Sequence, residues 1–282
     1  MAERIEDTSI AWKQIAGMWS TYFTPPSRIS PEEAERYRVW ITQLKPKTAL
    51  VLGATPELRD ILNGIGCETT VIDINLEMIV AMNSLVAINN PEEILVRANW
   101  LSNPLRSGYF DVVVGDAVLP NIPWKDRSLL LSEIKRVLRP TGVFITRAFY
   151  APRKKPFTEI SQLFEHFSQK EPSYRSALEL VLELQFFAYD QNDHIGSFAK
   201  AKDLLLRFRV GNKFNFRSES LRQILDMVWD VWCTRFANKV FVYAYKDEEE
   251  ADYNRYFEIA GTFESKDNPY SKLTPMYLLR SR

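Results

Sequence analysis

The chain has 282 residues, 46% of them hydrophobic, which is enough for one large domain or for one domain with an elaborate insertion. Its 36 basic and 36 acidic residues give a formal net charge of zero, so no bulk basic charge indicates a nucleic acid partner, although a local patch stays open. The two cysteines, Cys67 and Cys233, lack metal-ligand spacing, and neither a signal-peptide segment nor an apolar run of about 18 residues occurs, which predicts a reduced, cytoplasmic protein without a membrane span.

Two helices are expected before residue 45. Four aromatic residues recur near helical spacing in residues 10–23: Trp12, Trp19, Tyr22 and Phe23. A second helix is expected from Ser30, because Ser30-Pro31-Glu32-Glu33 places an N-cap, a proline and first-turn carboxylates in their preferred positions. The aromatic residues either pack on the sheet or belong to a lid over a ligand, formed by residues 21–30, with Tyr22 and Arg28 as its polar-tipped residues.

Residues 48–79 have the order strand, tight turn, helix, strand. The apolar run 49–52 predicts a buried strand, which Gly53 ends, and Thr55 and Pro56 fit a helix start as N-cap and first helical residue. A second strand, residues 70–72, ends in Asp73, which follows Gly53 by 20 residues. Acidic residues at about this spacing bind ribose hydroxyls in doubly wound folds. Alternatively, Asp73 caps the following segment, residues 75–88.

The turn discriminates between ligands. Dinucleotide sites normally have the pattern G-x-G-x-x-G, because glycines let the backbone approach a pyrophosphate. Here Gly53 is followed by Ala54, Thr55, Pro56 and Glu57, so the turn has one glycine and a first-turn carboxylate. Because a carboxylate repels phosphate, the turn argues against NAD and FAD, whereas a ligand with a sulfonium and an amino acid end would be tolerated.

Further apolar runs at residues 94–96, 112–114 and 143–145 alternate with segments of helical period such as 129–138. Strands that alternate with helices predict a parallel sheet covered on both faces. Ligands bind outside the carboxyl ends of the strands in such sheets. Asp73, Asn99 and Asp116 each follow a strand, so a single cleft is expected to collect all three.

In several segments the chain resembles the class I S-adenosylmethionine-dependent methyltransferases. Residues 50–53 are similar to the first family motif, although other residues replace its further glycines. Residues 71–75, followed by Met78 and Ile79, are similar to the second motif, whose acidic residue holds the ribose of the cofactor. Asn99-Trp100 takes the place of the adenine-contacting pair.

Two more segments continue the resemblance, in the order of the family. Residues 110–116 are similar to its fourth strand, whose end lies beside the transferred methyl group, and residues 138–146 are similar to the next turn and strand. The resemblance covers roughly residues 46–150. It implies S-adenosylmethionine as cofactor and the following binding residues: Tyr22, Arg28, Gly53, Ala54, Thr55, Glu57, Asp73, Ile74, Met78, Asn99, Trp100 and Asp116.

No catalytic residue can be assigned. Residues 116–121 lack the Asn-Pro-Pro-Tyr motif of amino-group methyltransferases, so Asp116 either orients an acceptor or the methionine end of the cofactor, or caps the following turn. His166 lies among aromatic residues on an expected helix, and His194 lies in a loop beside acidic residues. The acids and histidines show no metal-ligand spacing, so no metal is expected.

After residue 146 the pattern changes. Four helical segments, at residues 157–169, 177–189, 199–209 and 220–232, predict an inserted helical substrate cap over residues 151–250. The strands expected at residues 256–263 and 274–279 form the antiparallel C-terminal hairpin that the family has. Residues 240–245 fit either another strand or a helix that continues through residues 246–250.

The expected fold is therefore α/β and Rossmann-like: a doubly wound, mostly parallel seven-stranded sheet with a C-terminal antiparallel hairpin. An N-terminal helical lid (residues 1–45) and the helical insertion join a cofactor-binding core formed by residues 46–150 and 251–282. The leading hypothesis is a cytoplasmic methyltransferase for a small-molecule acceptor. The alternatives are a non-catalytic S-adenosylmethionine-binding protein and an RNA or protein methyltransferase, and a dinucleotide oxidoreductase ranks last. The acceptor, the methylated atom, the presence of a general base and the oligomeric state stay open.

Overall fold

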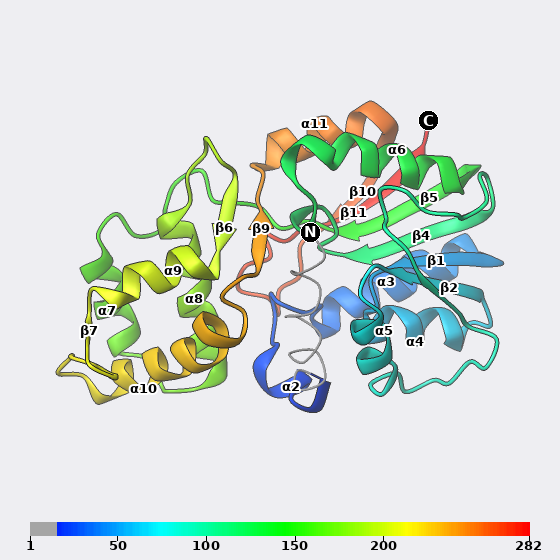
Figure 1. Ribbon diagram of the computed structural model, residues 1–282. Coiled ribbons are helices and arrows are strands. Elements are labelled where there is room, and N and C mark those ends of the chain that lie inside the picture. Colours follow the sequence, from blue (N-terminus) through cyan, green and yellow to red (C-terminus); the bar gives the residue numbers. More distant parts are fainter. Residues whose placement is uncertain (1–15) are drawn as a thin grey trace. The chain divides into compact units, whose positions relative to one another are not determined.

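The computed structural model describes residues 16–282, so Trp12 lies outside the described residues. The chain forms two compact units (Figure 1). The core unit contains Pro25–Tyr150 and Lys246–Arg282, and the helical unit contains Met18–Thr24 and Ala151–Tyr245. This division differs from the expected one, in which residues 1–45 form one lid and residue 250 ends the insertion.

The short helix α2 (Trp19–Tyr22) groups with the helical unit because it packs on α8 (Tyr174–Ala188). The ring of Tyr22 meets that of Tyr174 edge-on, with a centroid separation of 4.7 Å. Helices α3 (Pro31–Leu44) and α11 (Lys246–Tyr256) belong to the core unit. The expected N-terminal lid is therefore divided between the two units.

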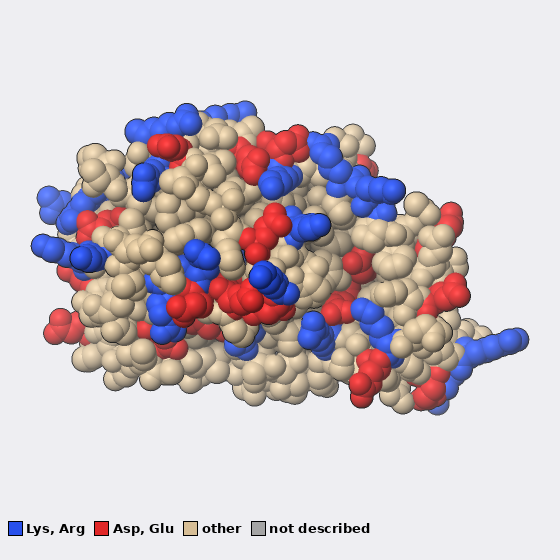
Figure 2. All heavy atoms as spheres, turned by 180° about the vertical axis from the view of Figure 1, so that it is seen from behind, with Lys and Arg blue, Asp and Glu red and all other residues tan. Residues whose placement is uncertain are grey.

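The surface carries both signs of charge. Figure 2 shows acidic and basic side chains interspersed over the visible face of both units. In the described part of the chain, no helix combines the length and the apolar character needed to cross a membrane.

The core unit contains the expected seven-stranded sheet, with strand order β10-β11-β5-β4-β1-β2-β3. Its strands are β1 (Thr48–Leu52), β2 (Glu68–Asp73), β3 (Ile94–Arg97), β4 (Phe110–Asp116), β5 (Leu138–Arg147), β10 (Phe257–Phe263) and β11 (Met276–Ser281). Strands β1 to β5 pair in parallel, whereas β11 is antiparallel to both β5 and β10. The predicted Rossmann-like fold with its C-terminal antiparallel hairpin is confirmed.

Helices cover both faces of this sheet (Figure 1). On one face lie α3, α4 (Pro56–Gly64) and α5 (Leu76–Asn83), and on the other lie α6 (Arg127–Val137) and α11. Two short 3₁₀ turns, Leu119–Asn121 and Trp124–Asp126, connect β4 to α6.

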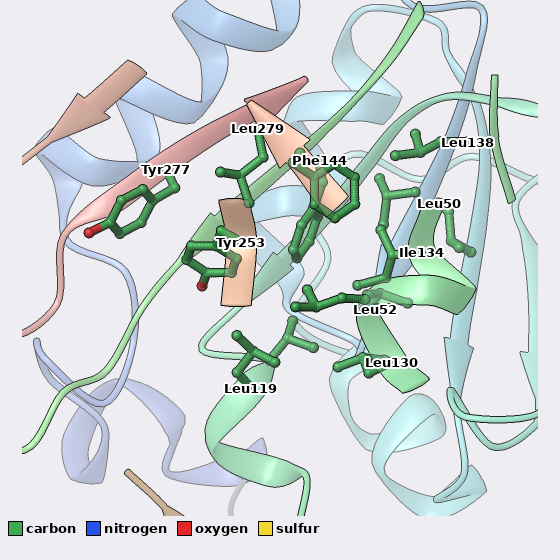
Figure 3. Packing of buried hydrophobic residues seen from close by; sticks show 14 of the residues in the cluster. Leu50, Leu52, Leu119, Leu130, Ile134, Leu138, Phe144, Tyr253, Tyr277 and Leu279 are labelled. Atoms are coloured by element: carbon green, nitrogen blue, oxygen red, sulfur yellow. The ribbon is translucent and has the colours of Figure 1, made fainter. Parts of the chain in front are cut away.

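The apolar core fills the space between the sheet and α6. Leu50 and Leu52 of β1, Phe144 of β5 and Ile134 of α6 converge there (Figure 3). Each such side chain contributes about 1.5 to 3 kcal/mol when it is removed from water. Because every residue of β1 is buried, this strand reads in the sequence as a continuous apolar run rather than an alternating one.

Local capping explains where two helices begin. At α3 the Glu33 N–H donates to Ser30 Oγ (3.2 Å) and the Ser30 N–H donates to Glu33 Oε2 (2.7 Å), which forms a complete capping box. The predicted start of this helix is confirmed. Thr55 and Pro56 take the predicted positions in α4, but the Thr55 hydroxyl makes no capping bond, so that part of the prediction is wrong. The ψ angle is 113° at Thr55 and 166° at Ser30, so the two backbones present their hydroxyls differently.

The helical unit contains the four predicted helices, of which α8 is longer than expected and the other three are shorter. They are α7 (Ile160–Ser168), α8, α9 (Phe198–Leu206) and α10 (Glu219–Val228), the last of which continues into a π-helix, Trp229–Arg235. Two small antiparallel pairs accompany them: β6 (Ile195–Ser197) with β9 (Val240–Val242), and β7 (Arg209–Val210) with β8 (Lys213–Phe214). Residues 240–242 are therefore a strand, and α11 begins separately at Lys246.

Asp111 of β4 bonds to residues at the amino-terminal ends of β1 and β5, and so links three neighbouring strands. Its Oδ2 accepts from the backbone N–H groups of Lys47 (2.8 Å) and Thr48 (3.0 Å), and its Oδ1 pairs with Arg139. Burial alone would raise the pKa of the Asp111 carboxyl, but the two backbone N–H groups and Arg139 outweigh it and lower that pKa overall.

We expect Asp111→Asn to lower the free energy of unfolding at pH 7 by about 1.5 to 3 kcal/mol, the range for hydrogen bonds to a charged group. Because the folded pKa is lowered, this stabilisation is complete above the unfolded value of about 3.9 and is lost as the pH falls through the folded pKa. Urea denaturation at pH 7 and at pH 3 would measure it. The control is Asp126→Asn, because the Asp126 side chain makes no helix-capping bond. Equal stability of wild type and Asp111→Asn at pH 7 would contradict this account.

Candidate functional site

The turn after β1 is the first component of the site. Gly53 has a φ of +88°, a left-handed conformation that favours glycine, and its N–H donates to the Ile72 carbonyl (3.0 Å). A Cβ atom at Gly53 would lie 3.8 Å from the Trp100 ring and 4.0 Å from the Met78 methyl group. The structure therefore brings together Gly53, Met78 and Trp100, which come from three separate segments, while Ala54 beside them is fully buried.

Trp100 lies across the ends of β1 and β2. Its indole Nε1–H donates to the Ile72 carbonyl (2.8 Å), which is the oxygen that also accepts from Gly53. Asn99 is exposed, and its Oδ1 accepts from the Leu101 N–H (2.9 Å). Of the expected adenine-contacting pair, Trp100 reaches the glycine turn, whereas Asn99 shapes the turn that follows β3.

Asp73 ends β2 and is buried. Its Oδ1 accepts from the Asn75 N–H (2.7 Å), and the Asn75 side chain accepts from the Met78 N–H (3.2 Å) at the start of α5. Asn75, and not Asp73, is therefore the helix cap. Ile74, between them, is 45% exposed.

Glu57 and Arg28 form an ion pair on the first turn of α4, with Arg28 Nη2 at 3.1 Å from Glu57 Oε1. Both side chains are largely covered, at 22% and 28% exposure respectively. The sequence argument against phosphate ligands depends on the negative charge of Glu57. The positive charge of Arg28 offsets that charge. Tyr22, by contrast, belongs to the helical unit, where burial and then its hydrogen bond with Tyr174 raise the pKa of its hydroxyl.

A buried cluster of three charges lies at the ends of β4 and β5. Arg147 donates through Nε to Asp116 Oδ1 (2.7 Å) and through Nη2 to Oδ2 (3.1 Å), a bidentate pair, and through Nη1 to Glu33 Oε2 (3.3 Å). The side chains of Arg147 and Glu33 are 1% exposed and that of Asp116 is 10% exposed. We call these three residues the charged triad. Asp116 is thus a partner of Arg147, and the expectation that it caps the following turn is wrong.

Burial raises the pKa of the Asp116 carboxyl, Arg147 opposes this shift, and the charge of Glu33 adds to it. Burial alone would lower the pKa of the Arg147 guanidinium, but Asp116 and Glu33 outweigh it and raise that pKa. Arg147 therefore stays positively charged.

Neutral groups surround the charged triad. Glu33 accepts from the Ser265 hydroxyl (3.2 Å) and the Asn268 amide (2.9 Å), both in the loop between β10 and β11. The Tyr37 hydroxyl donates to the Gly115 carbonyl (2.9 Å). A Cβ at Gly115 would lie 2.3 Å from the Val118 side chain, so only glycine fits there. The start of α3 and the β10–β11 loop are thereby bonded to the ends of two central strands.

The sequence does not predict Glu33, Tyr37 or Arg147 as site residues. The only signal for Arg147 is a charged residue two positions after the apolar run 143–145. Glu33 is predicted as a helix-capping residue, which it is, but its hydrogen-bond partners lie up to 235 residues away in the chain.

The two histidines belong to the helical unit. The His166 ring lies 5.6 Å from the Phe157 ring and 5.3 Å from the Phe167 ring, and His194 Nδ1 lies 3.3 Å from the Tyr189 hydroxyl. Within residues 16–282, no three His, Cys, Asp or Glu side chains are grouped so that they could hold a metal ion.

The core unit contains a segment that is similar in sequence to a known protein family. Residues 53–146, about a third of the chain, match the family model described as "Methyltransferase domain". This segment of the core unit is therefore similar to a methyltransferase domain. The matched segment runs from Gly53 to Thr146 and so includes Asp73, Trp100 and Asp116. Among curated proteins, no significant sequence match is found.

Solved structures share the fold over nearly the whole chain. A protein from Rhodobacter sphaeroides described as a zinc-dependent alcohol dehydrogenase has a TM-score of 0.61 at 16% identity, covering 98% of this chain and 99% of that one. The N-methyltransferase NodS from Bradyrhizobium japonicum, in complex with S-adenosylhomocysteine, has a TM-score of 0.51 at 10% identity, covering 98% of both chains.

A third similar structure is the 1,6-didemethyltoxoflavin-N1-methyltransferase of Burkholderia thailandensis, with its acceptor and S-adenosylhomocysteine bound. It has a TM-score of 0.51 at 12% identity and covers 99% of this chain and 88% of that one. At these identities the three structures establish the fold alone.

We expect Arg147→Met to lower the free energy of unfolding by about 3 to 5 kcal/mol, because it leaves two buried carboxylates without their cation. Urea denaturation would measure the loss. Arg38→Met is the control, since Arg38 forms an exposed pair with Glu35 (60% and 64% exposed), which contributes at most about 1 kcal/mol. If the two substitutions cost the same, the charged triad does not stabilise the fold as described.

Proposed function

We propose that this protein is a cytoplasmic methyltransferase that transfers the methyl group of S-adenosylmethionine to a small-molecule acceptor. The observation that carries the proposal is the grouping of Gly53, Asp73, Met78 and Trp100 at the carboxyl ends of β1 and β2, within the segment that matches the methyltransferase domain. Ligands of parallel α/β sheets bind at this edge. The two cysteines of the chain are free and buried, which supports the reducing compartment.

The residues at this edge fit the parts of the cofactor. Asp73 offers a carboxylate to the ribose diol, and Trp100 and Met78 offer an aromatic and a thioether surface to the adenine ring. Ile74 and Asn99, the neighbours in sequence of Asp73 and Trp100, are proposed as further contacts of the cofactor. The turn residues Gly53, Ala54 and Thr55 approach the cofactor through their backbone, and Arg28 and Glu57 offer opposite charges to its amino acid end.

S-adenosylmethionine supplies an electrophilic methyl group, and in-line displacement from it depends largely on alignment. Proximity and orientation provide about 7 to 11 kcal/mol in well-aligned reactions. In this proposal, the core unit therefore holds the methyl donor at a fixed position. Asp116 contributes to this at the end of β4, where Arg147 binds it. The helical unit is proposed as the substrate cap, and Tyr22 of α2 as its contribution to closing the cofactor site.

A small-molecule acceptor is supported by charge and by one fold neighbour. The formal net charge is zero, and on the face that Figure 2 shows, acidic and basic side chains are interspersed. The neighbour from Burkholderia thailandensis binds the small molecule 1,6-didemethyltoxoflavin. An RNA or protein acceptor would require a basic, aromatic-lined face on the helical unit, and binding of RNA in a salt-dependent manner would favour that alternative.

A second candidate function is S-adenosylmethionine binding without methyl transfer. One observation favours it. The Gly53 turn lacks the further glycines of the family, and the side chains of Trp100 and Met78 lie 3.8 Å and 4.0 Å from the position of a Cβ at Gly53. Formation of S-adenosylhomocysteine across a panel of amine, hydroxyl and thiol acceptors would support the enzyme. Saturable binding without turnover for every acceptor would favour the binding protein.

We expect Asp73→Ala to weaken S-adenosylmethionine binding about 10- to 150-fold, because it removes charge-assisted hydrogen bonds to the ribose. Isothermal titration would measure the affinity. The matched control is Asn75→Ala, which removes the cap of α5 and keeps the carboxylate, so we expect a smaller change. Unchanged affinity in a folded Asp73→Ala variant would remove Asp73 from the ribose site.

A further inference from the structure

The charged triad contains one more negative than positive charge. Arg147 neutralises one carboxylate, and Asp116 and Glu33 supply two. The other groups bonded to Glu33 are neutral donors: the Ser30 N–H, the Ser265 hydroxyl and the Asn268 amide. None of these three donors carries a charge, so Arg147 is the only cation bonded to Glu33 among the described residues.

This excess charge lies at the same edge of the sheet as the glycine turn. Asp116 and Arg147 are register partners at the ends of β4 and β5, and the end of β1 pairs with the end of β4 through Leu52 and Gly115. Of the three side chains, Asp116 is the most open, at 10% exposure. The neighbouring Arg28–Glu57 pair adds no net charge, because its two members cancel.

A buried net charge costs free energy unless a counter-charge approaches it, and its field is screened less than that of a surface charge. We infer that the charged triad makes the site selective for the charge of the cofactor, so that it binds the cationic sulfonium of S-adenosylmethionine in preference to the neutral thioether of S-adenosylhomocysteine. The inference rests on the proposed function. The inference assigns a role in cofactor specificity to the charge of Glu33, which binds the opposite end of the Arg147 guanidinium from Asp116.

The charge that this selectivity depends on disappears from the cofactor during methyl transfer. Methyl transfer forms a bond between the acceptor and the methyl carbon, and the electron pair of the broken carbon–sulfur bond stays on sulfur, which becomes neutral. The attraction of the charged triad is then lost at the moment when product must leave. The triad would therefore favour binding of the donor and release of the spent cofactor.

The test is the ratio of two affinities, measured by isothermal titration with S-adenosylmethionine and S-adenosylhomocysteine at pH 8. Glu33→Gln removes one charge, keeps the size of the side chain and keeps an acceptor for the Ser30 N–H. We expect the preference for S-adenosylmethionine to fall by roughly three- to thirtyfold, as for one charge about 8 to 25 Å away in a medium of effective dielectric about 20. Most of that fall should come from S-adenosylmethionine.

Two further variants separate charge from contact. Glu35→Gln is the control, because Glu35 lies on the same helix but is exposed and paired with Arg38, so the ratio should not change. Asp116→Asn removes the other carboxylate charge and keeps one acceptor oxygen for Arg147, so the ratio should fall as for Glu33→Gln. This variant also serves if Glu33→Gln does not fold.

The outcomes distinguish the inference from the proposed function. If wild type binds both ligands and the ratio falls in Glu33→Gln or Asp116→Asn but not in Glu35→Gln, the inference is supported. If the triad variants lose both affinities equally or keep the wild-type ratio, the charged triad is only structural and the inference is overturned. If wild type binds neither ligand, the proposed function fails first, and the inference fails with it.

Discussion

The ion pair between Arg147 and Asp116, extended to Glu33, is the interaction on which the geometry of the core unit depends. It joins the ends of β4 and β5 to the first turn of α3, and through Glu33 to the loop between β10 and β11. Removal of either the guanidinium or a carboxylate from such a buried group destabilises the fold, because the remaining charge has no water to solvate it. The edge of the sheet that faces the proposed cofactor is therefore fixed by polar contacts, whereas its interior is fixed by apolar packing.

Parallel pairing explains why residues from distant segments meet at that edge. Strands β1, β2 and β4 end together, so Gly53, Asp73 and Asp116 lie on one side of the sheet although the sequence separates them. Trp100 adds a residue from beyond β3 and bonds back to the Ile72 carbonyl. The single glycine of the turn is compatible with this arrangement, because a larger side chain is excluded by its φ of +88° more than by lack of space.

The sequence predicts the sheet and most helices because their signals are local. Buried parallel strands are continuous apolar runs, as at Val112–Val114, and the start of α3 follows from the capping box at Ser30. The partnership of Arg147 with Glu33 is not local, since 114 residues separate them, and no single-chain pattern marks it. The same holds for α2, whose packing on α8 depends on a ring contact between Tyr22 and Tyr174. Short aromatic helices have no sequence feature that selects the surface they pack on.

The central claim is that the edge of the core sheet binds S-adenosylmethionine. Titration of the full chain with S-adenosylmethionine, S-adenosylhomocysteine and NADH tests it most directly, because one similar fold carries a dehydrogenase description and another binds S-adenosylhomocysteine. The account predicts saturable micromolar binding of the first two ligands and none of NADH. Binding of NADH without S-adenosylmethionine would contradict it and would make the core unit a dinucleotide site.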